Sequence, residues 1–117
     1  MVAQLDTPDG PLTVVNTHLS FVPGWNRLQL RHLRRDLAAL PGPHVLMGDL
    51  NMAPPAPERI TGMRGLGRAV TFPAGAPARQ LDHVLVDRGG PLLERHCSAP
   101  MLPISDHRPL IVDVEAC

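Results

Sequence analysis

One amphipathic segment constrains the fold of this chain more than any other feature. Residues 26–40, "NRLQLRHLRRDLAAL", carry leucines at the 3-4-3 spacing of a single helical face, and the arginines lie largely on other faces. The leucines of this apolar stripe are Leu30, Leu33, Leu37 and Leu40. Pro-Gly-Pro at 41–43 ends the segment. The sequence therefore predicts one main helix.

About six short strand-like segments accompany this helix. They are residues 2–5, 12–15, 44–48, 80–87, 91–98 and 108–115. "TPDGP" separates the first two, and these turn residues predict a hairpin. With 10 Gly and 14 Pro, loops should be abundant and ordered elements short. Residues 53–78 are weakly patterned, with a brief helical turn expected near 58–61.

Composition narrows the class of protein. Eleven basic and eleven acidic residues give a net charge of zero, and aromatic residues make up only 3%, so neither a strong electrostatic grip on nucleic acid or membrane nor a base-stacking platform is expected. Cys97 and Cys117 fit no metal spacing and form no disulfide framework. No apolar run reaches the about 18 residues of a membrane span. No leader is visible, so we expect one cytoplasmic domain over residues 1–117.

Polar residues follow or interrupt the apolar strands in four places: "VVNTHLS", "VLMGDLN", "QLDHVLV" and "ISDHRPL". Strand ends are where folds build sites, because the backbone holds side chains rigidly while loops leave room for substrate. The residues that these stretches would bring together are Asn16, His18, Asp49, Asn51, Asp82, Asp106 and His107. Buried unpaired charge is costly, so this set indicates a site rather than chance.

The chemistry of this set suits phosphate esters. Carboxylate and amide oxygens are hard ligands for Mg²⁺ or Mn²⁺. An imidazole oriented by a carboxylate acts as a general acid or base near neutral pH, and a second imidazole stabilises oxygens that gain charge. Together these groups fit metal-assisted attack of water on a phosphate ester. Zinc hydrolysis is disfavoured because no H-E-x-x-H motif is present.

Taken singly, the motifs leave simpler interpretations open. The acid–Leu–amide stretch at 49–51 also fits a polar turn, and His18 also fits the edge of a core. In "SDH" (105–107) a serine triad is disfavoured, because adjacent strand residues face apart and no nucleophile-elbow glycines flank the serine. By the same geometry only one of Asp82 and His83 joins a site. The histidines without a partner pattern, predicted at the surface or at strand edges, are His32, His44 and His96.

Taken in order, "NTHL", "GDLN", "LDHVLV" and "SDHRPL" resemble the motifs of the endonuclease/exonuclease/phosphatase superfamily, the deoxyribonuclease I-like fold. The helix is similar too, since an Arg and a Gln commonly precede its apolar stripe in that family. The resemblance extends from Val2 to Glu115. It implies an α/β (α+β) chain in a four-layer α/β sandwich, of which residues 1–117 would be the C-terminal part.

The resemblance also implies catalytic roles. His107 would be the general base or a transition-state stabiliser, and Asp82 would orient its imidazole. Asp49 would orient or activate the attacking water. Asn51 would steady the phosphate and the nucleophile, and His18 would contact the phosphate or assist the leaving oxygen. The implied function is a divalent-metal-dependent phosphoesterase.

The same resemblance implies ligands and partners. Asp106, with Asp49 and Asn51, would bind Mg²⁺ or Mn²⁺. Asn16, with His18 and Asn51, would contact the substrate phosphate or only brace its loop. The substrate would be a phosphodiester or phosphomonoester, with nucleic acid as one class. The helix arginines would either touch phosphates or form a solvated face.

One expected part of the family pattern is missing from the chain. Family members are usually much longer, and their N-terminal half supplies a metal-binding glutamate; Glu58, Glu94 and Glu115 lie elsewhere in the pattern. The chain is then either the C-terminal half of a longer enzyme or a short protein that completes an open half-sandwich by self-association or with a partner. The alternative function is a truncated, non-catalytic remnant or interaction module.

Overall fold

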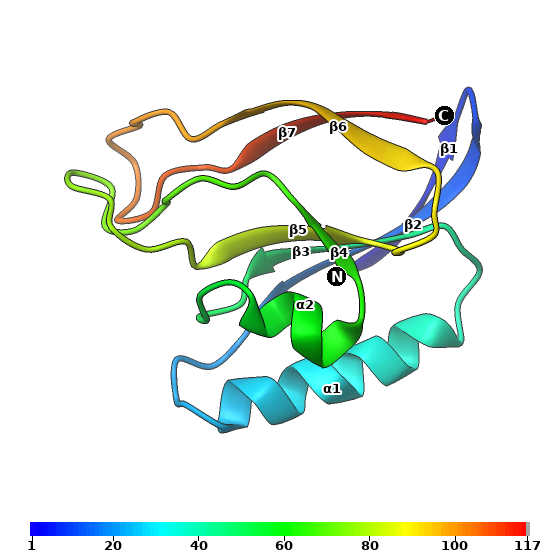
Figure 1. Cartoon of the computed structure of the whole chain (residues 1–117), viewed down its shortest axis with the longest axis horizontal. Helices are drawn as coiled ribbons and strands as arrows, with labels where there is room; N and C mark the ends of the chain where they lie inside the picture. The colour runs from blue at the N-terminus through cyan, green and yellow to red at the C-terminus, as the bar shows by residue number, and fades with distance from the viewer. Residues whose placement is uncertain (117) are drawn as a thin grey trace.

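The computed structural model of the chain describes residues 1–116, which form three layers. In chain order its elements are β1 (Val2–Thr7), β2 (Gly10–His18), α1 (Trp25–Ala38), β3 (His44–Asp49), α2 (Ala56–Thr61), β4 (Arg64–Leu66), β5 (Asp82–Val86), β6 (Leu92–Ser98) and β7 (Ile111–Ala116). Both helices cover one face of a five-stranded sheet, and the β6–β7 pair lies over the other face (Figure 1).

The five-stranded sheet has the order β1-β2-β3-β5-β4. β1 and β2 form the predicted antiparallel hairpin, and β3 runs parallel to β2 after the α1 crossover. β5 is antiparallel to β3. The ends of β2 and β3 therefore meet the start of β5 at one edge, with His18 opposite Asp49 and Asp49 opposite Asp82. We call this end of the strands, which carries His18, Asp49 and Asp82, the site edge of the sheet.

The main core lies between this sheet and the helices. From the predicted stripe Leu30 and Leu37 are fully buried, whereas Leu40 is exposed because the helix ends at Ala38. They pack with sheet residues such as Leu46 and Leu85. Apolar side chains on this helical face thus dock α1 under β3 and β5, which fixes the site edge from below.

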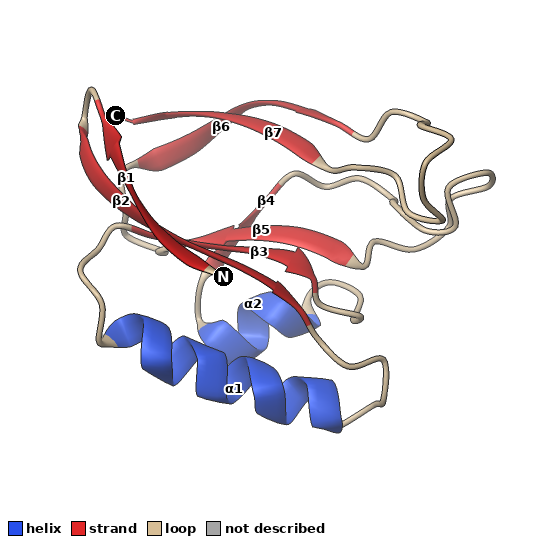
Figure 2. Ribbon diagram, turned by 180° about the vertical axis from the view of Figure 1, so that it is seen from behind, coloured by secondary structure: helices blue, strands red, loops and turns tan. Residues whose placement is uncertain are grey.

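The opposite face of the sheet is apolar as well. Val14, Met47 and Val84 point from it toward Val112 of β7, and between the two sheets runs an apolar groove of about 420 Å³. The two-stranded β6–β7 sheet lies over this face (Figure 2), and its Leu92, Val112 and Val114 line the groove. A two-stranded sheet is marginal alone, so the packing of Leu92 and Val112 against the five-stranded sheet helps to hold β6 and β7 in place.

The structure differs from the predicted elements mainly between residues 53 and 81. β4 was not predicted, because its three residues, with Gly65 at the centre, show no alternation. α2 is a six-residue helix rather than a brief turn. β5 begins at Asp82, since the amide of Gln80 donates to the carbonyl of Gly67 and the Leu81 N–H to Thr71 Oγ1.

Three further expectations concern the last strand, the cysteines and the membrane. β7 begins at Ile111 rather than at residue 108, because the Arg108 N–H bonds to the Thr71 carbonyl and Pro109 has no N–H to donate. Cys97 is a free thiol, and Cys117 lies outside the described residues. Among the described helices, none combines the length and the apolar character needed to cross a bilayer.

Candidate active site

The site edge of the sheet opens into a pocket of about 670 Å³. Six of the seven residues predicted from the motifs line it: His18, Asp49, Asn51, Asp82, Asp106 and His107. The seventh, Asn16, is exposed on β2 and lines a smaller neighbouring pocket together with Asp82. The topology thus brings together side chains that are up to about ninety positions apart in the sequence (18 to 107).

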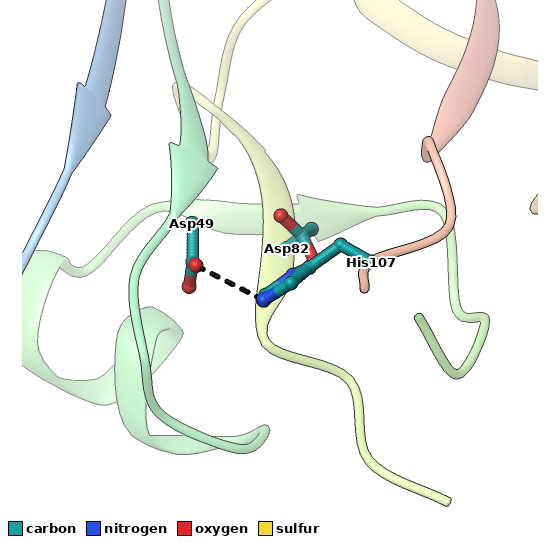
Figure 3. Close-up of side chains that lie close together, drawn as sticks. All are labelled: Asp49, Asp82 and His107. Carbon is teal, nitrogen blue, oxygen red and sulfur yellow. Dashed lines mark hydrogen bonds and ion pairs between the residues drawn. The ribbon is translucent and has the colours of Figure 1, made fainter. Parts of the chain in front are cut away.

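His107 is held in place by Asp82. Its Nδ1 lies 2.7 Å from Oδ2 of Asp82, and Thr71 Oγ1 donates to the same oxygen at 2.7 Å. The Phe72 ring packs beside the imidazole, with centroids 4.9 Å apart. The second ring nitrogen, Nε2, lies 3.5 Å from Oδ2 of Asp49 (Figure 3). One side of the ring is therefore anchored, while Nε2 faces the pocket.

Asp49 stands at the end of β3 between the two histidines. Its Oδ1 accepts the Asn51 N–H at 3.0 Å, and its Oδ2 lies 3.3 Å from Nε2 of His18. Burial raises the pKa of Asp49; the hydrogen bond from Asn51 opposes this rise, and the charge of Asp82 adds to it. The carboxylate is therefore a better proton acceptor than an exposed aspartate.

The charge of His107 is set by its neighbours. Burial works against the imidazolium, but the hydrogen bond to Asp82 and the negative charges of the surrounding aspartates outweigh it and raise the pKa of His107. The raised pKa extends the protonated form toward higher pH than for a free histidine. Two titratable groups with altered pKa values thus face each other across the pocket, a pattern typical of functional sites.

The backbone around Asp49 explains why the sequence reads Gly-Asp-Leu-Asn. Gly48 has φ 136°, and a Cβ there would lie 1.8 Å from the Thr17 carbonyl oxygen, so only glycine fits beside β2. Asn51 has φ 51°, and its side-chain amide donates to the Leu19 carbonyl at 2.7 Å. The amide nitrogen of Asn51 is thus engaged in joining the loop after β2 to the turn after β3.

The other predicted residues differ in exposure. The His18 side chain is 76% exposed. Asp106 is exposed at the pocket rim, where Ser105 Oγ lies 3.4 Å from its carboxylate. Asp82 and His83 face apart as predicted, since His83 is buried on the helix side, where burial lowers its pKa. The serine of "SDH" accepts the His107 N–H and is not aligned as a triad nucleophile.

Three side chains of the site lie close enough together to hold a metal ion. Asp49, Asp82 and His107 each offer one ligand atom, and these atoms lie within 4.8 Å of one another. Two carboxylates at that spacing fit Mg²⁺ or Mn²⁺, which commonly take one or two carboxylates and complete the shell with water and phosphate oxygens. Of the predicted carboxylate ligands, Asp49 belongs to this group and Asp106 does not. Asn51, the third predicted ligand, lines the same pocket.

Sequence reasoning missed the residues that support the pair of Asp82 and His107. Thr71 and Phe72 come from the weakly patterned stretch before β5, and Arg79 of the same stretch lines the pocket. Their segment folds back through the Phe72–Arg79 bridge. The local pattern does not signal these contacts, because the partners lie outside the regular strands or far along the chain: Thr71 and Asp82 are 11 positions apart, and Phe72 reaches His107 in the loop before β7.

The sequence and the fold were compared with known families and solved structures. The sequence model of the Endonuclease/Exonuclease/phosphatase family matches residues 2–107. An endonuclease/exonuclease/phosphatase from Bacteroides vulgatus shares 25% identity, with 91% of this chain and 50% of that chain covered and a TM-score of 0.74. TDP2 from D. rerio, complexed with a single-strand DNA product, shares 14% identity, with 98% and 60% covered and a TM-score of 0.77.

A beta toxin variant from Staphylococcus aureus with bound magnesium ions shares 12% identity, with 93% of this chain and 55% of that chain covered and a TM-score of 0.67. No curated protein matches the sequence. The chain thus spans about half the length of these solved structures. The predicted deoxyribonuclease I-like fold is confirmed by this likeness, and by the family match over residues 2–107 the chain belongs to the endonuclease/exonuclease/phosphatase family.

Proposed function

We propose that this chain carries the reaction centre of a divalent-metal-dependent phosphoesterase. The observation that carries the proposal is the line from Asp82 through His107 to Asp49, which ends in an open pocket. Asp82 anchors Nδ1 of the ring, so that Nε2 is presented toward the space between His107 and Asp49. This is the geometry needed to move a proton and stabilise charge beside a phosphate.

The two facing groups divide the work. Asp49 orients the attacking water and accepts its proton, since the carboxylate is held toward the pocket by the Asn51 N–H. His107, protonated and anchored by Asp82, donates from Nε2 to a phosphoryl oxygen as negative charge develops there. His18, exposed beside Asp49, contacts the phosphate or the leaving oxygen. The directions of both pKa shifts agree with this division.

The proposed metal requirement rests on the aspartates at the site edge. Asp49 and Asp82 would hold the ion, with Asp106 and Asn51 at the rim as further ligands. A bound divalent cation polarises phosphoryl oxygens and lowers the pKa of water. The magnesium ions in the beta toxin neighbour support this part of the proposal.

The substrate class is a phosphodiester or phosphomonoester. The single-strand DNA product bound to the TDP2 neighbour supports nucleic acid as one substrate class. Arg79 lines the pocket and supplies a positive group that a phosphate would meet, and His18 lines it with an imidazole that can hydrogen-bond a phosphate oxygen. Because the net charge is zero, we expect modest affinity that depends on these local contacts rather than on long-range attraction.

The proposal is tested by assaying bis-p-nitrophenyl phosphate and plasmid DNA with Mg²⁺ or Mn²⁺, with EDTA, and with the His107→Ala variant. Hydrolysis that requires the metal and is lost in the variant supports a working site. Hydrolysis that the variant retains would contradict the role assigned to His107.

The alternative is a non-catalytic interaction module, and the open apolar groove between the sheets favours it. It predicts a folded chain, verified by circular dichroism, that neither hydrolyses these esters nor binds Mn²⁺ by electron paramagnetic resonance. Light scattering of the same sample measures whether the chain self-associates, as an open half-sandwich would.

A further inference from the structure

Two polar side chains occupy core positions beside the turn after β3. Asn26 on α1 lies one helical turn before Leu30 and continues the buried stripe, and it is only 3% exposed. His83 on β5 shares the buried helix-facing side with Leu85 and is likewise 3% exposed. Polar groups at such positions cost free energy unless they are hydrogen-bonded, so their partners are informative.

Both side chains donate to consecutive carbonyls of that turn. Asn26 Nδ2 donates to the Asn51 carbonyl at 3.0 Å, and His83 Nε2 lies 2.7 Å from the Met52 carbonyl oxygen. The donors come from different layers, since α1 lies below the sheet and β5 lies beside β3 within it (Figure 1). Two elements far apart in sequence thus hold neighbouring peptide groups of one turn.

The turn itself benefits from such support. Asn51 adopts φ 51°, in the left-handed region. Asparagine enters this region more readily than most residues other than glycine, and contacts around the turn favour it further. Its N–H donates to Oδ1 of Asp49, and the preceding Leu50 N–H donates to the Leu81 carbonyl. The direction of the Asp49 carboxylate is therefore tied to the conformation of residue 51.

We propose that Asn26 and His83 are positioning residues that fix the 49–52 turn and thereby aim the Asp49 carboxylate at His107. Neither side chain lines the pocket, so each acts through the backbone of the turn. The catalytic part of this inference rests on the proposed function. Its structural part, the fixing of the turn, does not.

The decisive variant is Asn26→Leu, which completes the apolar stripe but removes the donor to the Asn51 carbonyl. Because the Asn51 carbonyl loses its donor, we expect a modestly lower melting temperature. At a temperature where the variant is folded, kcat should fall by about 10²-fold with little change in KM, because small misplacements of a reacting group are costly. The matched control is Arg31→Leu, which introduces the same side chain on the exposed face of the same helix and should leave both quantities unchanged.

The His83 variants test the second contact with the same turn, the one that comes from β5. Gln can donate an amide hydrogen to the Met52 carbonyl, so His83→Gln should restore most of the turnover that His83→Leu loses. A fall in kcat that follows only the loss of folded protein in either series would show a purely structural role and overturn the inference.

A readout without activity keeps this inference separate from the proposed function. By amide hydrogen exchange measured with NMR, the Asn51 N–H should be protected in the unaltered chain and should exchange about tenfold faster or more in Asn26→Leu, as expected for a locally loosened segment. A chain inactive on every ester but showing this change would sink the proposed function and leave the fixing of the turn standing. Unchanged exchange and unchanged kcat in Asn26→Leu would overturn the inference.

Discussion

A histidine–aspartate contact lies at each end of β3, and the two differ in how the fold surrounds them. At its first residue, His44 Nδ1 lies 3.1 Å from Oδ1 of Asp87, its backbone N–H donates to the other oxygen at 2.7 Å, and its Nε2 lies 2.7 Å from the Leu40 carbonyl. At the opposite end, His107 has one nitrogen anchored and the other 3.5 Å from Asp49 in an open pocket.

The difference lies in what each pair leaves unused. Around His44 both ring nitrogens and both carboxylate oxygens have close partners within the chain, so the pair fastens the loop after α1 to the loop after β5. Around His107 the anchoring by Asp82 presents Nε2 to the pocket. A reactive site therefore requires a polar atom that the fold orients but does not satisfy.

The largest expected effect comes from removing the reactive member of this comparison. His107→Ala should lower kcat by about 10²–10⁴-fold, the usual contribution of a positioned acid or base. Because the side chain is only partly buried and lies in a loop, we expect the melting temperature to change little. Steady-state hydrolysis of bis-p-nitrophenyl phosphate, together with a thermal melt, measures both quantities.

His44→Ala is the matched control for His107→Ala. It also removes an imidazole bonded to an aspartate, but it should leave kcat unchanged at a temperature where the variant is folded. Equal losses of kcat in the two variants would refute the distinction drawn between the ends of β3.

Asp49→Asn should separate activity from stability. Turnover should fall by at least about 10²-fold, since the proton acceptor is lost. Stability at pH 7 should rise, because a carboxyl whose pKa is raised on folding favours its protonated form and opposes folding above its unfolded pKa of about 3.9. Urea unfolding of the variant and the unaltered chain at pH 7 tests the sign; a less stable variant would contradict it.

The pH dependence follows from the raised pKa of His107. Turnover should decline as pH rises through this pKa, above the ordinary value of about 6.5, because the donating imidazolium is lost. If His107 were instead the general base, turnover would increase over the same range. A pH–rate profile, with the ring titrated in parallel by NMR, distinguishes these two roles.

The same shift has a consequence for stability. A histidine whose pKa is raised in the folded state stabilises fully below its unfolded pKa, and this contribution is lost as pH rises through the folded pKa. The difference in unfolding free energy between the unaltered chain and His107→Gln should therefore shrink as pH rises from about 6 to 9. A difference that grows over this range would show that the sign is wrong.

At the other end of β3 the expected effect is on stability alone. Asp87→Ala removes the acceptor of both the His44 N–H and its ring, so we expect a loss of about 1–3 kcal/mol, the usual cost of leaving buried donors unpaired. Urea unfolding measures the loss, and kcat of the folded variant should be unchanged. A change smaller than the error of the fit would show that the pair does not fasten these loops.

The sequence was sufficient for features that local patterns encode. The stripe of α1 and the β1–β2 hairpin were predicted from spacing and turn residues. The structure confirms the hairpin and, except for the exposed Leu40, the stripe. The four motifs named six residues that line the site pocket. His18, Asp49 and Asp82 stand at strand ends, as expected, whereas Asp106 and His107 come from the loop before β7. Family resemblance supplied their expected roles, which stay predictions.

The rest depended on contacts that no local pattern encodes. The conformation of residues 53–81 could not be predicted from the sequence, because Thr71 and Phe72 are positioned by pairing with Arg79 and by contact with the loop before β7. Asn26 was readable only as a polar residue at a stripe position, a signal that acquires meaning once the turn it supports is known. The partner of His44 was also missed, since Asp87 lies 43 residues away.

The smallest expected effect concerns another histidine–aspartate pair, on the outer β6–β7 sheet. His96 Nδ1 lies 3.9 Å from Oδ2 of Asp113, and both side chains are about 70% exposed. Water satisfies such groups well, so His96→Ala should change the unfolding free energy by less than about 1 kcal/mol and leave kcat unchanged. These three pairs share one chemistry and differ in how the fold surrounds them: His96 is solvated, His44 has partners within the chain, and His107 is oriented toward a pocket. A larger effect of His96→Ala in either assay would mean that exposure does not predict how much such a pair contributes to stability or turnover.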